Sequence, residues 1–281
     1  MTLPADSHVH TEWSWDAVRG SMERTCQRAV ELGLPAVAFT EHVDHTVWML
    51  DRSQVDDDAH LLTFTSPEGI VTPGPFDAAG YLEAVAACRD RHPGLRILTG
   101  LELGEPHLHP EAVDRALAAG SFDRVLGSLH CMPDGDGWTE PGELFGRRPA
   151  ADIVRTYLRD VAAMVAADDT FEVLAHVDYP IRSWDETAHG PFDPADVELE
   201  FRDALEAAAA AGKALEINTV LPLHQTVVRW WREVGGGAVS FGSDAHEPAE
   251  LARRFTEAAG LAEACGFRPG RDPHDLWPRA R

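Results

Sequence analysis

The sequence has little positive charge and no long apolar run. Lysine and arginine together number 24 against 47 aspartate and glutamate residues, so the 281-residue chain has a formal net charge of -23 at pH 7. Affinity for polymeric nucleic acid or anionic lipid is dominated by lysine and arginine that neutralise phosphates. No stretch approaches the roughly 18 consecutive apolar residues of a membrane span. We therefore expect a small-molecule partner, with no polymeric nucleic acid and no membrane.

Cysteine is scarce as well, since there are only four and none forms a Cys-x-x-Cys pair. This spacing suggests neither a thiolate zinc knuckle nor a disulfide framework. Together with the lack of a charged and apolar leader, it favours the reducing cytoplasm. There is also no Ser/Gly-rich linker, and the length is ordinary for one α/β barrel. We therefore expect a single domain over residues 1–281, and the oligomeric state stays open.

What the sequence does contain is a series of short apolar runs that alternate with amphipathic helical stretches, as in βα units around a parallel sheet. The first strand is expected to end at about His8, and the others to span about 35–41, 95–102, 124–130, 171–176, 214–218 and 238–244. Helices are expected at about 21–32, 77–91, 150–167 and 194–211. The seven strands predict an α/β barrel with a polar loop insertion at about 43–76. Loops of that length are usually functional lids or partly disordered.

Imidazole and carboxylate side chains recur where these strands end. They are His8, His10, His42, Glu102, His130, His176, Asp244 and His246. In a parallel α/β barrel the C-terminal ends of the strands meet on one face, where active sites lie. His8 and His10 are two residues apart, so a strand points both side chains to the same face as a chelating pair. The pattern predicts one site at this face.

Nitrogen and oxygen ligands without thiolates suit divalent ions such as zinc, manganese or iron. Eight or nine ligands are more than one ion takes, so the sequence predicts two or three ions. A carboxylate such as Glu102 can bridge two of them. A hydroxide between two ions would attack phosphorus or a carbonyl carbon, while the ions hold the developing negative charge.

The motifs HVH, TEH, LELG, GSLH, LAH and GSDAH stand in this order along nearly the whole chain. This series resembles the PHP (polymerase and histidinol phosphatase) family, and most of all its stand-alone histidinol-phosphatase type. The resemblance implies a distorted (β/α)7 barrel with a trinuclear metal site at the C-terminal ends of the strands. It also implies hydrolysis of L-histidinol phosphate to L-histidinol and phosphate, a step of histidine biosynthesis.

The resemblance further implies which residues hold each ion. One ion would take His8, His10, Glu102 and Asp244, the second Glu102, His130 and His176, and the third Asp16, His42 and His246. The hydroxide would lie between the first two ions. Asp244 or a neighbouring histidine would protonate the leaving alkoxide, so Asp244, His176 and Glu102 are the expected catalytic residues. Glu12 is an alternative to Asp16, and Glu41 is expected to support the site from behind.

Recognition of a phosphate monoester calls for a counter-charge, and a guanidinium offers two parallel donors. Arg182, six residues after His176, is the first candidate. Histidinol phosphatases usually carry a basic residue in the loop after the strand that ends in Glu-Ile-Asn. Here residues 219–224 have no lysine or arginine, and His224 is the candidate substitute.

Three functions follow from these observations. The favoured one is a phosphomonoesterase of a small phosphorylated metabolite, most of all L-histidinol phosphate. The alternative is a PHP-type phosphodiesterase that acts on a small nucleotide or another phosphate ester. The third is a metal-binding module without activity, which predicts missing ligands, and none is clearly missing.

Overall fold

The computed structural model describes residues 3–54 and 59–280, so residues 55–58 of the predicted insertion lie outside the described part of the chain. Its main sheet has the strand order β1-β2-β5-β6-β9-β10-β11-β12, in which the first seven strands are parallel and β12 is antiparallel to β11. The strands are β1 (Asp6–Val9), β2 (Ala36–Val43), β5 (Arg96–Gly104), β6 (Arg124–Ser128), β9 (Val173–Leu174), β10 (Ala214–Asn218), β11 (Ala238–Gly242) and β12 (Trp277–Pro278).

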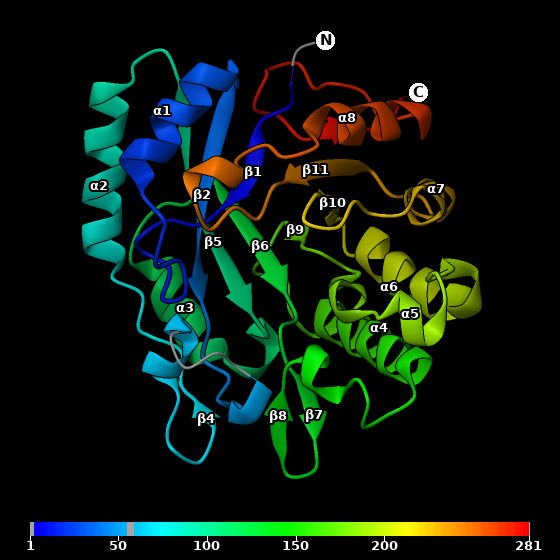
Figure 1. The fold of residues 1–281 in the computed structure, drawn as a ribbon. Coiled ribbons are helices and arrows are strands. Elements are labelled where there is room, and N and C mark those ends of the chain that lie inside the picture. Colours follow the sequence, from blue (N-terminus) through cyan, green and yellow to red (C-terminus); the bar gives the residue numbers. More distant parts are fainter. Residues whose placement is uncertain (1–2, 55–58, 281) are drawn as a thin grey trace.

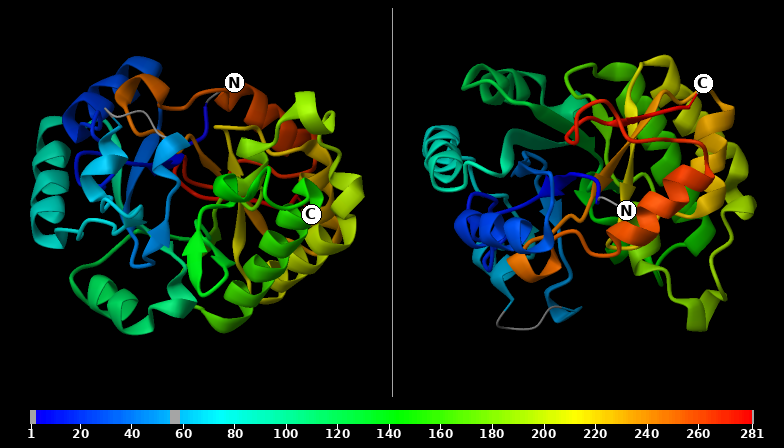
Figure 2. Two further views of the ribbon diagram at one scale, coloured as in Figure 1. Left: turned by 60° about the horizontal axis from the view of Figure 1, so that its bottom comes forward. Right: turned by 90° about the horizontal axis from the view of Figure 1, so that it is seen from above.

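The sheet curls into a distorted barrel because its first and last parallel strands meet. Val9 forms a parallel bridge with Ala245 just past β11, and the Asp244 amide donates to the carbonyl oxygen of His8 at 2.8 Å. Asp6 reinforces this joint, since its carboxylate accepts from the amides of Ser243 at 3.0 Å and Ala252 at 2.9 Å. Helices surround the strands (Figure 2). The predicted seven-stranded α/β barrel is therefore confirmed.

The helices lie on the outside of the sheet (Figure 1). They are α1 (Met22–Leu32), α2 (Ala78–Arg91), α3 (Pro110–Ala118), α4 (Ala150–Ala167), α5 (Glu186–His189), α6 (Glu198–Ala210), α7 (Gln225–Glu233) and α8 (Phe255–Ala264). The ends of α1 follow from its sequence, because Ser21 Oγ caps the amide of Arg24 and Gly33 ends the helix with φ 69°. The expected helix at 194–211 begins with a 3-10 turn, Pro194–Val197, before α6.

Two small hairpins project from the C-terminal ends of the strands. One pairs β3 (Trp48–Met49) with β4 (Ile70–Val71) inside the 43–76 insertion, and the other pairs β7 (Met132–Asp134) with β8 (Gly137–Thr139). Both extend from the same end of the molecule, opposite the two termini (Figure 1). Trp48 and Cys131 belong to one buried apolar cluster, so the insertion packs against the second hairpin.

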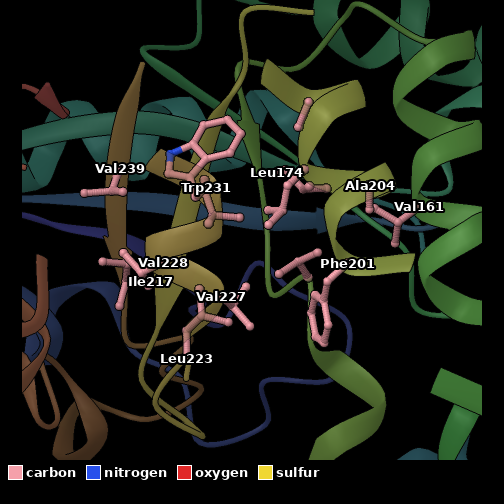
Figure 3. Packing of buried hydrophobic residues seen from close by; sticks show 14 of the residues in the cluster. Val161, Leu174, Phe201, Ala204, Ile217, Leu223, Val227, Val228, Trp231 and Val239 are labelled. Atoms are coloured by element: carbon pink, nitrogen blue, oxygen red, sulfur yellow. The ribbon is translucent and has the colours of Figure 1, made fainter. Parts of the chain in front are cut away.

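The largest apolar core lies between the sheet and the helices α4, α6, α7 and α8. Ile217 of β10 and Val239 of β11 meet Trp231 of α7 there, and Phe201 of α6 lies close by (Figure 3). Trp231 is 0% exposed and its indole nitrogen donates to the carbonyl oxygen of Ala238 at 3.0 Å. The tryptophan pair of α7 is therefore a core element.

The C-terminal segment returns to the barrel. Residues 268–273 are mostly exposed, as expected of a solvated tail, but Trp277 is buried and β12 then pairs with β11. Alternation of apolar residues did not predict this strand because it is only two residues long. Within the described residues, no helix combines the length and the apolar character that crossing a membrane requires.

Candidate metal centre and active site

Glu102, at the C-terminal end of β5, lies at the centre of the cluster that the strand ends form. Its Oε2 is 3.1 Å from His8 Nε2, 3.3 Å from His10 Nε2 and 3.2 Å from His42 Nδ1. Its Oε1 is 2.8 Å from His176 Nε2 and 3.3 Å from His130 Nε2. Four strands and the segments just past them therefore direct five imidazoles onto one carboxylate. Glu102 itself is 0% exposed.

Two further carboxylates complete this cluster. Asp244 Oδ1 lies 3.6 Å from His8 Nε2 and 3.3 Å from His10 Nε2. Asp16 Oδ2 lies 3.4 Å from His42 Nε2 and 3.3 Å from His246 Nε2. Glu12 points elsewhere, because it accepts from the amide of Met22 at 2.6 Å at the start of α1. All nine predicted metal ligands thus lie together, but the structure does not separate them into the three groups that the resemblance implied. The nitrogen atoms of His10, His42 and His246 converge with one another, as do ligand atoms of His8, Glu102 and His176.

The geometry of these groups suits divalent ions. Ligand atoms about 2.0–2.1 Å from a tetrahedral zinc ion are about 3.3 Å apart, and most of the separations above are close to this value. Glu102 Oε2 and His42 Nδ1 are buried without a hydrogen bond, although they lie only 3.2 Å apart. Lone pairs that converge without hydrogen bonding to one another are what a shared cation requires. Nitrogen and oxygen donors without thiolate fit zinc, manganese or iron.

The electrostatics of the cluster ionise Glu102 and keep His10 neutral, as metal binding needs. Burial alone would raise the pKa of Glu102, but the imidazoles of His8, His130 and His42 outweigh it and hold that pKa well below its usual range. Burial, reinforced by the nearby imidazoles of His42 and His246, lowers the pKa of His10 to about 4. Near pH 7 the carboxylate is therefore ionised, and the His10 imidazole is neutral with a free lone pair. Burial alone would lower the pKa of His8, His42 and His130, but the surrounding carboxylates outweigh it and raise all three, so a metal ion would displace protons from these imidazoles.

A second layer of polar residues orients these side chains. Glu216 of β10 accepts from His8 Nδ1 at 2.7 Å and from the amide of His176 at 2.8 Å. Ser14 Oγ lies 3.1 Å from His10 Nδ1 and donates to Glu41 Oε2 at 2.6 Å. Outer partners of this kind set the tautomer and the direction of a ligating imidazole. Glu41 thus supports the site from behind, as its position before His42 suggested.

Sequence reasoning missed Asp44, which lies between two of the histidines. Its Oδ1 is 3.3 Å from His130 Nδ1, its Oδ2 is 3.4 Å from His42 Nδ1, and Trp15 Nε1 donates to it at 2.9 Å. A signal for it was present in the glycine of the LELG motif. A Cβ atom on Gly104 would lie 2.1 Å from Asp44 Oδ1, so this strand end is open for the carboxylate.

The backbone is strained where it presents one of the ligands. Asp244 has φ 52° and lies in the left-handed region, which L-residues seldom adopt. Gly242, two residues earlier, leaves room for the Glu216 carboxylate. A Cβ atom there would lie 1.9 Å from Glu216 Oε1 and 2.6 Å from His8 Cβ. The glycine of the GSDAH motif is thus explained by the close approach of Glu216, and its aspartate is held in a strained backbone conformation that presents a candidate ligand.

A cavity of about 280 Å³ opens beside this cluster. His42, His130, His176, Asp244 and His246 line one part of it. The 43–76 insertion lines another part through Asp44, Thr46, Trp48, Leu61 and Pro73. The volume is near the lower end of the range for small-molecule pockets. The cavity therefore has room for a metabolite and is too small for a folded polymer.

The two residues expected to bind substrate have different positions. Arg182 lines the cavity, donates to Asp244 Oδ2 at 2.7 Å, and its guanidinium lies 4.9 Å from the centre of the Tyr179 ring. His224 is exposed at the start of α7, where its Nδ1 accepts from the amide of Thr226 at 3.2 Å. It lines a neighbouring hollow that also reaches Arg182. The structure thus brings Arg182 to the site and leaves His224 outside the cavity.

Comparison with known proteins gives results of two kinds. A family model described as PHP domain matches residues 6–220. A relative from Deinococcus radiodurans, named "Probable histidinol-phosphatase", is 29% identical over 283 residues, which cover 95% of this chain and 96% of the relative. A relative of the same name from Clostridium acetobutylicum is 22% identical and covers 94% of each chain.

A solved structure gives the second kind of result. The crystal structure of histidinol phosphate phosphatase from Lactococcus lactis, complexed with zinc, L-histidinol and phosphate, matches with a TM-score of 0.78. The match covers 98% of this chain and 99% of that one, at 20% sequence identity. At this identity the likeness shows a shared fold.

Proposed function

This chain belongs to the PHP domain family, and from that premise we propose that it is a metal-dependent phosphomonoesterase of a small phosphorylated metabolite. L-Histidinol phosphate is the leading substrate, because two relatives that span nearly the whole chain are named as histidinol phosphatases. The observation that carries the proposal is the convergence of five imidazoles on the two oxygens of buried Glu102.

We propose the nine converging residues as the metal ligands. His8, His10, Glu102 and Asp244 would hold one ion, Glu102, His130 and His176 a second, and Asp16, His42 and His246 a third. Ions held there would lower the pKa of a bound water and draw negative charge from the phosphoryl oxygens. Zinc, manganese and iron all suit these donors, so availability would decide among them.

The other residues of the cavity would bind and orient the ester. Arg182 is the only lysine or arginine among the described residues that line the cavity, so it is the candidate partner for a phosphate oxygen. Its contact with the Tyr179 ring and its bond to Asp244 hold the guanidinium in place. Asp244 and His246 both line the cavity, and both stay candidates for protonating the leaving alkoxide.

Two further parts of the proposal concern the whole chain. We propose one domain, because β11 continues the sheet beyond residue 220 and the segment after it carries Asp244 and His246. We propose a cytoplasmic location, because the four cysteines are all free and buried.

The test is phosphate release from a panel of phosphorylated metabolites by purified protein loaded with zinc or manganese. We expect L-histidinol phosphate to be hydrolysed, and a chelator to abolish the activity until metal is restored. Faster turnover of bis-p-nitrophenyl phosphate than of p-nitrophenyl phosphate would instead favour the phosphodiesterase alternative. Undiminished phosphate release by the fully chelated protein would overturn the metal-dependent mechanism.

A further inference from the structure

Glu140 lines the cavity and is not one of the proposed metal ligands or their supporting residues. It directly follows β8 and precedes a 3-10 turn, Pro141–Leu144. Its one recorded hydrogen bond comes from the Tyr179 hydroxyl at 3.5 Å, which is at the limit for such a bond. Among the described residues it forms no ion pair within 4.0 Å. A carboxylate thus faces the cavity with almost no partner.

The other carboxylates of the cavity lining are already bound. Glu105 accepts from the backbone amides of His130 and Cys131. Asp44 accepts from Trp15 and lies against two imidazoles. Asp16 and Asp244 belong to the proposed metal ligands. Glu140 is therefore the carboxylate of the described cavity lining that no neighbour satisfies.

The described lining of the cavity offers Glu140 no free lysine or arginine. Arg182 is the only arginine or lysine of the described lining, and it donates to Asp244 at 2.7 Å. Burial raises the pKa of Glu140 to about 7; His130 partly offsets this, whereas Asp16 and Glu143 add to it. Glu140 is half-buried, and an ionised carboxylate that is partly withdrawn from water without a counter-ion costs free energy. A cation that enters the cavity would remove this cost.

The remaining walls of the cavity also suit a cation. Trp15, Trp48 and Tyr179 line it together with Glu140. The faces of aromatic rings carry partial negative charge and attract ammonium groups. The lining thus combines one unsatisfied carboxylate with several aromatic rings.

We propose that Glu140 binds a protonated amine on the organic part of the substrate, so that the enzyme selects phosphate monoesters that carry an ammonium group. This inference rests on the proposed function, because it assumes that the phosphate lies at the metal ligands. The Tyr179 hydroxyl lies 3.5 Å from the carboxylate, so it leaves the oxygens of Glu140 available to the ammonium group. Glu140 is thereby a specificity residue, and the ester's phosphate is recognised elsewhere in the cavity.

Binding of the dephosphorylated alcohol tests the proposal without turnover. Calorimetry on zinc-loaded protein would compare L-histidinol, which has a free amine, with N-acetyl-L-histidinol, in which the amine is neutral. We expect the unmodified chain to bind L-histidinol at least about tenfold more tightly, and Glu140→Gln to bind both compounds equally. Glu143→Gln is the matched control, because Glu143 lies on the same turn, accepts from the amide of Asp51 and does not line the cavity.

Each outcome decides the proposal. A tenfold preference that persists in Glu140→Gln would overturn it, as would the absence of any preference in the unmodified chain. Should Glu140→Gln fail to fold, Glu140→Asp takes its place and is expected to show an intermediate preference. Inorganic phosphate should bind Glu140→Gln as it binds the unmodified chain, since the proposed phosphate site is intact.

Kinetics separates this inference from the proposed function. A preference for the free amine without hydrolysis of any monoester would leave the amine site standing and refute the phosphatase. Hydrolysis of p-nitrophenyl phosphate without a preference for the free amine would support the phosphatase and refute the amine site. If Glu140→Gln lowered kcat equally for p-nitrophenyl phosphate and for L-histidinol phosphate, Glu140 would act in the chemistry, and the amine site would be wrong.

Discussion

The core beneath α7 and the cluster around Glu102 are equally buried and differ in what holds them. Trp231 and Glu102 are both 0% exposed. Trp231 gains free energy from leaving water, because its surface is mostly apolar. Glu102 loses free energy on burial unless cations or hydrogen-bond donors surround it. The comparison teaches that the helix-covered core stabilises this barrel, while the strand ends carry groups kept for chemistry.

The largest effect should come from the core. Trp231→Ala removes a fully buried indole from the cluster of Figure 3 and should lower the free energy of unfolding by about 3–5 kcal/mol. Urea unfolding measures this change. Leu199→Ala on α6 is the control, since Leu199 is 68% exposed and its loss should change stability by less than about 0.5 kcal/mol. A loss below about 1 kcal/mol for Trp231→Ala would contradict the claim that this core stabilises the barrel.

Glu102→Gln, in contrast to Trp231→Ala, should strongly reduce activity and affect stability less. The change keeps the volume and removes the charge that five imidazoles face, so kcat/KM should fall by about a thousandfold or more, close to 4 kcal/mol. The carboxylates of Asp16, Asp44 and Asp244 still face the imidazoles, so the metal-free protein should lose less stability than Trp231→Ala does.

Phosphate release and metal content of the metal-loaded Glu102→Gln protein check the first half of this prediction, and urea unfolding of the metal-free protein checks the second. The control is Glu111→Gln on α3, whose side chain is 94% exposed and does not line the cavity. Full metal content together with full activity in Glu102→Gln would show that the cluster is structural.

A smaller effect is expected from the second layer of the site. Asp44→Asn removes the carboxylate that faces His42 Nδ1 and His130 Nδ1, and outer partners of metal ligands contribute about 10–100-fold to affinity or activity. Gly104→Ala should have a similar effect, because the added Cβ displaces Asp44. Activity measured as a function of zinc concentration would report it. Gly94→Ala is the control, since its Cβ meets no atom within 4 Å, and an equal loss there would refute the explanation.

The smallest effect belongs to the surface between α1 and α2. Glu23 Oε2 accepts from Arg91 Nε at 2.6 Å and its Oε1 lies 3.0 Å from His92 Nε2, and the Arg91 bond is the main cause that lowers the pKa of Glu23 to about 2. A folded pKa below the unfolded value means that the interaction stabilises above about pH 4.5 and is lost as the pH falls towards 2.

Because solvent screens this pair, Glu23→Gln should lower the free energy of unfolding by less than about 1 kcal/mol at pH 7. Urea unfolding at pH 7 and pH 3 would show a difference that shrinks at the lower pH. Glu83→Gln on α2, which removes an exposed and unpaired carboxylate of the described chain, should show no such trend. If the stability difference between the unmodified chain and Glu23→Gln grew towards pH 3, the pKa of Glu23 would not be lowered by folding.

Much of the site could be predicted because its ligands occupy strand ends. His8, Glu102 and Asp244 are visible in the sequence, since each ends or follows a short apolar run. Asp44 and Glu216 were missed for a physical reason. Their carboxylates act on neighbouring imidazoles across strands, and only the pairing of β2 with β5 and of β10 with β11 brings them there.

Loop positions were harder to predict. Arg182 was the first candidate for phosphate binding and His224 the candidate substitute for a missing basic residue, yet only Arg182 lines the cavity. The β7–β8 hairpin was not predicted from the sequence, because its strands have three residues each and no clear alternation. Glu140, which follows that hairpin, could not be placed in the cavity before the hairpin was known.

The sequence by itself determined the barrel and the set of converging histidines and carboxylates, because strand periodicity and parallel connection oblige the ends of apolar runs to meet on one face. The tertiary structure alone decided which polar residues support that set and which line the cavity. Those contacts join residues far apart in the chain, such as His8 with Glu216 and Asp44 with His130, and their distances depend on how strands and loops pack. Local sequence patterns carry no information about such packing.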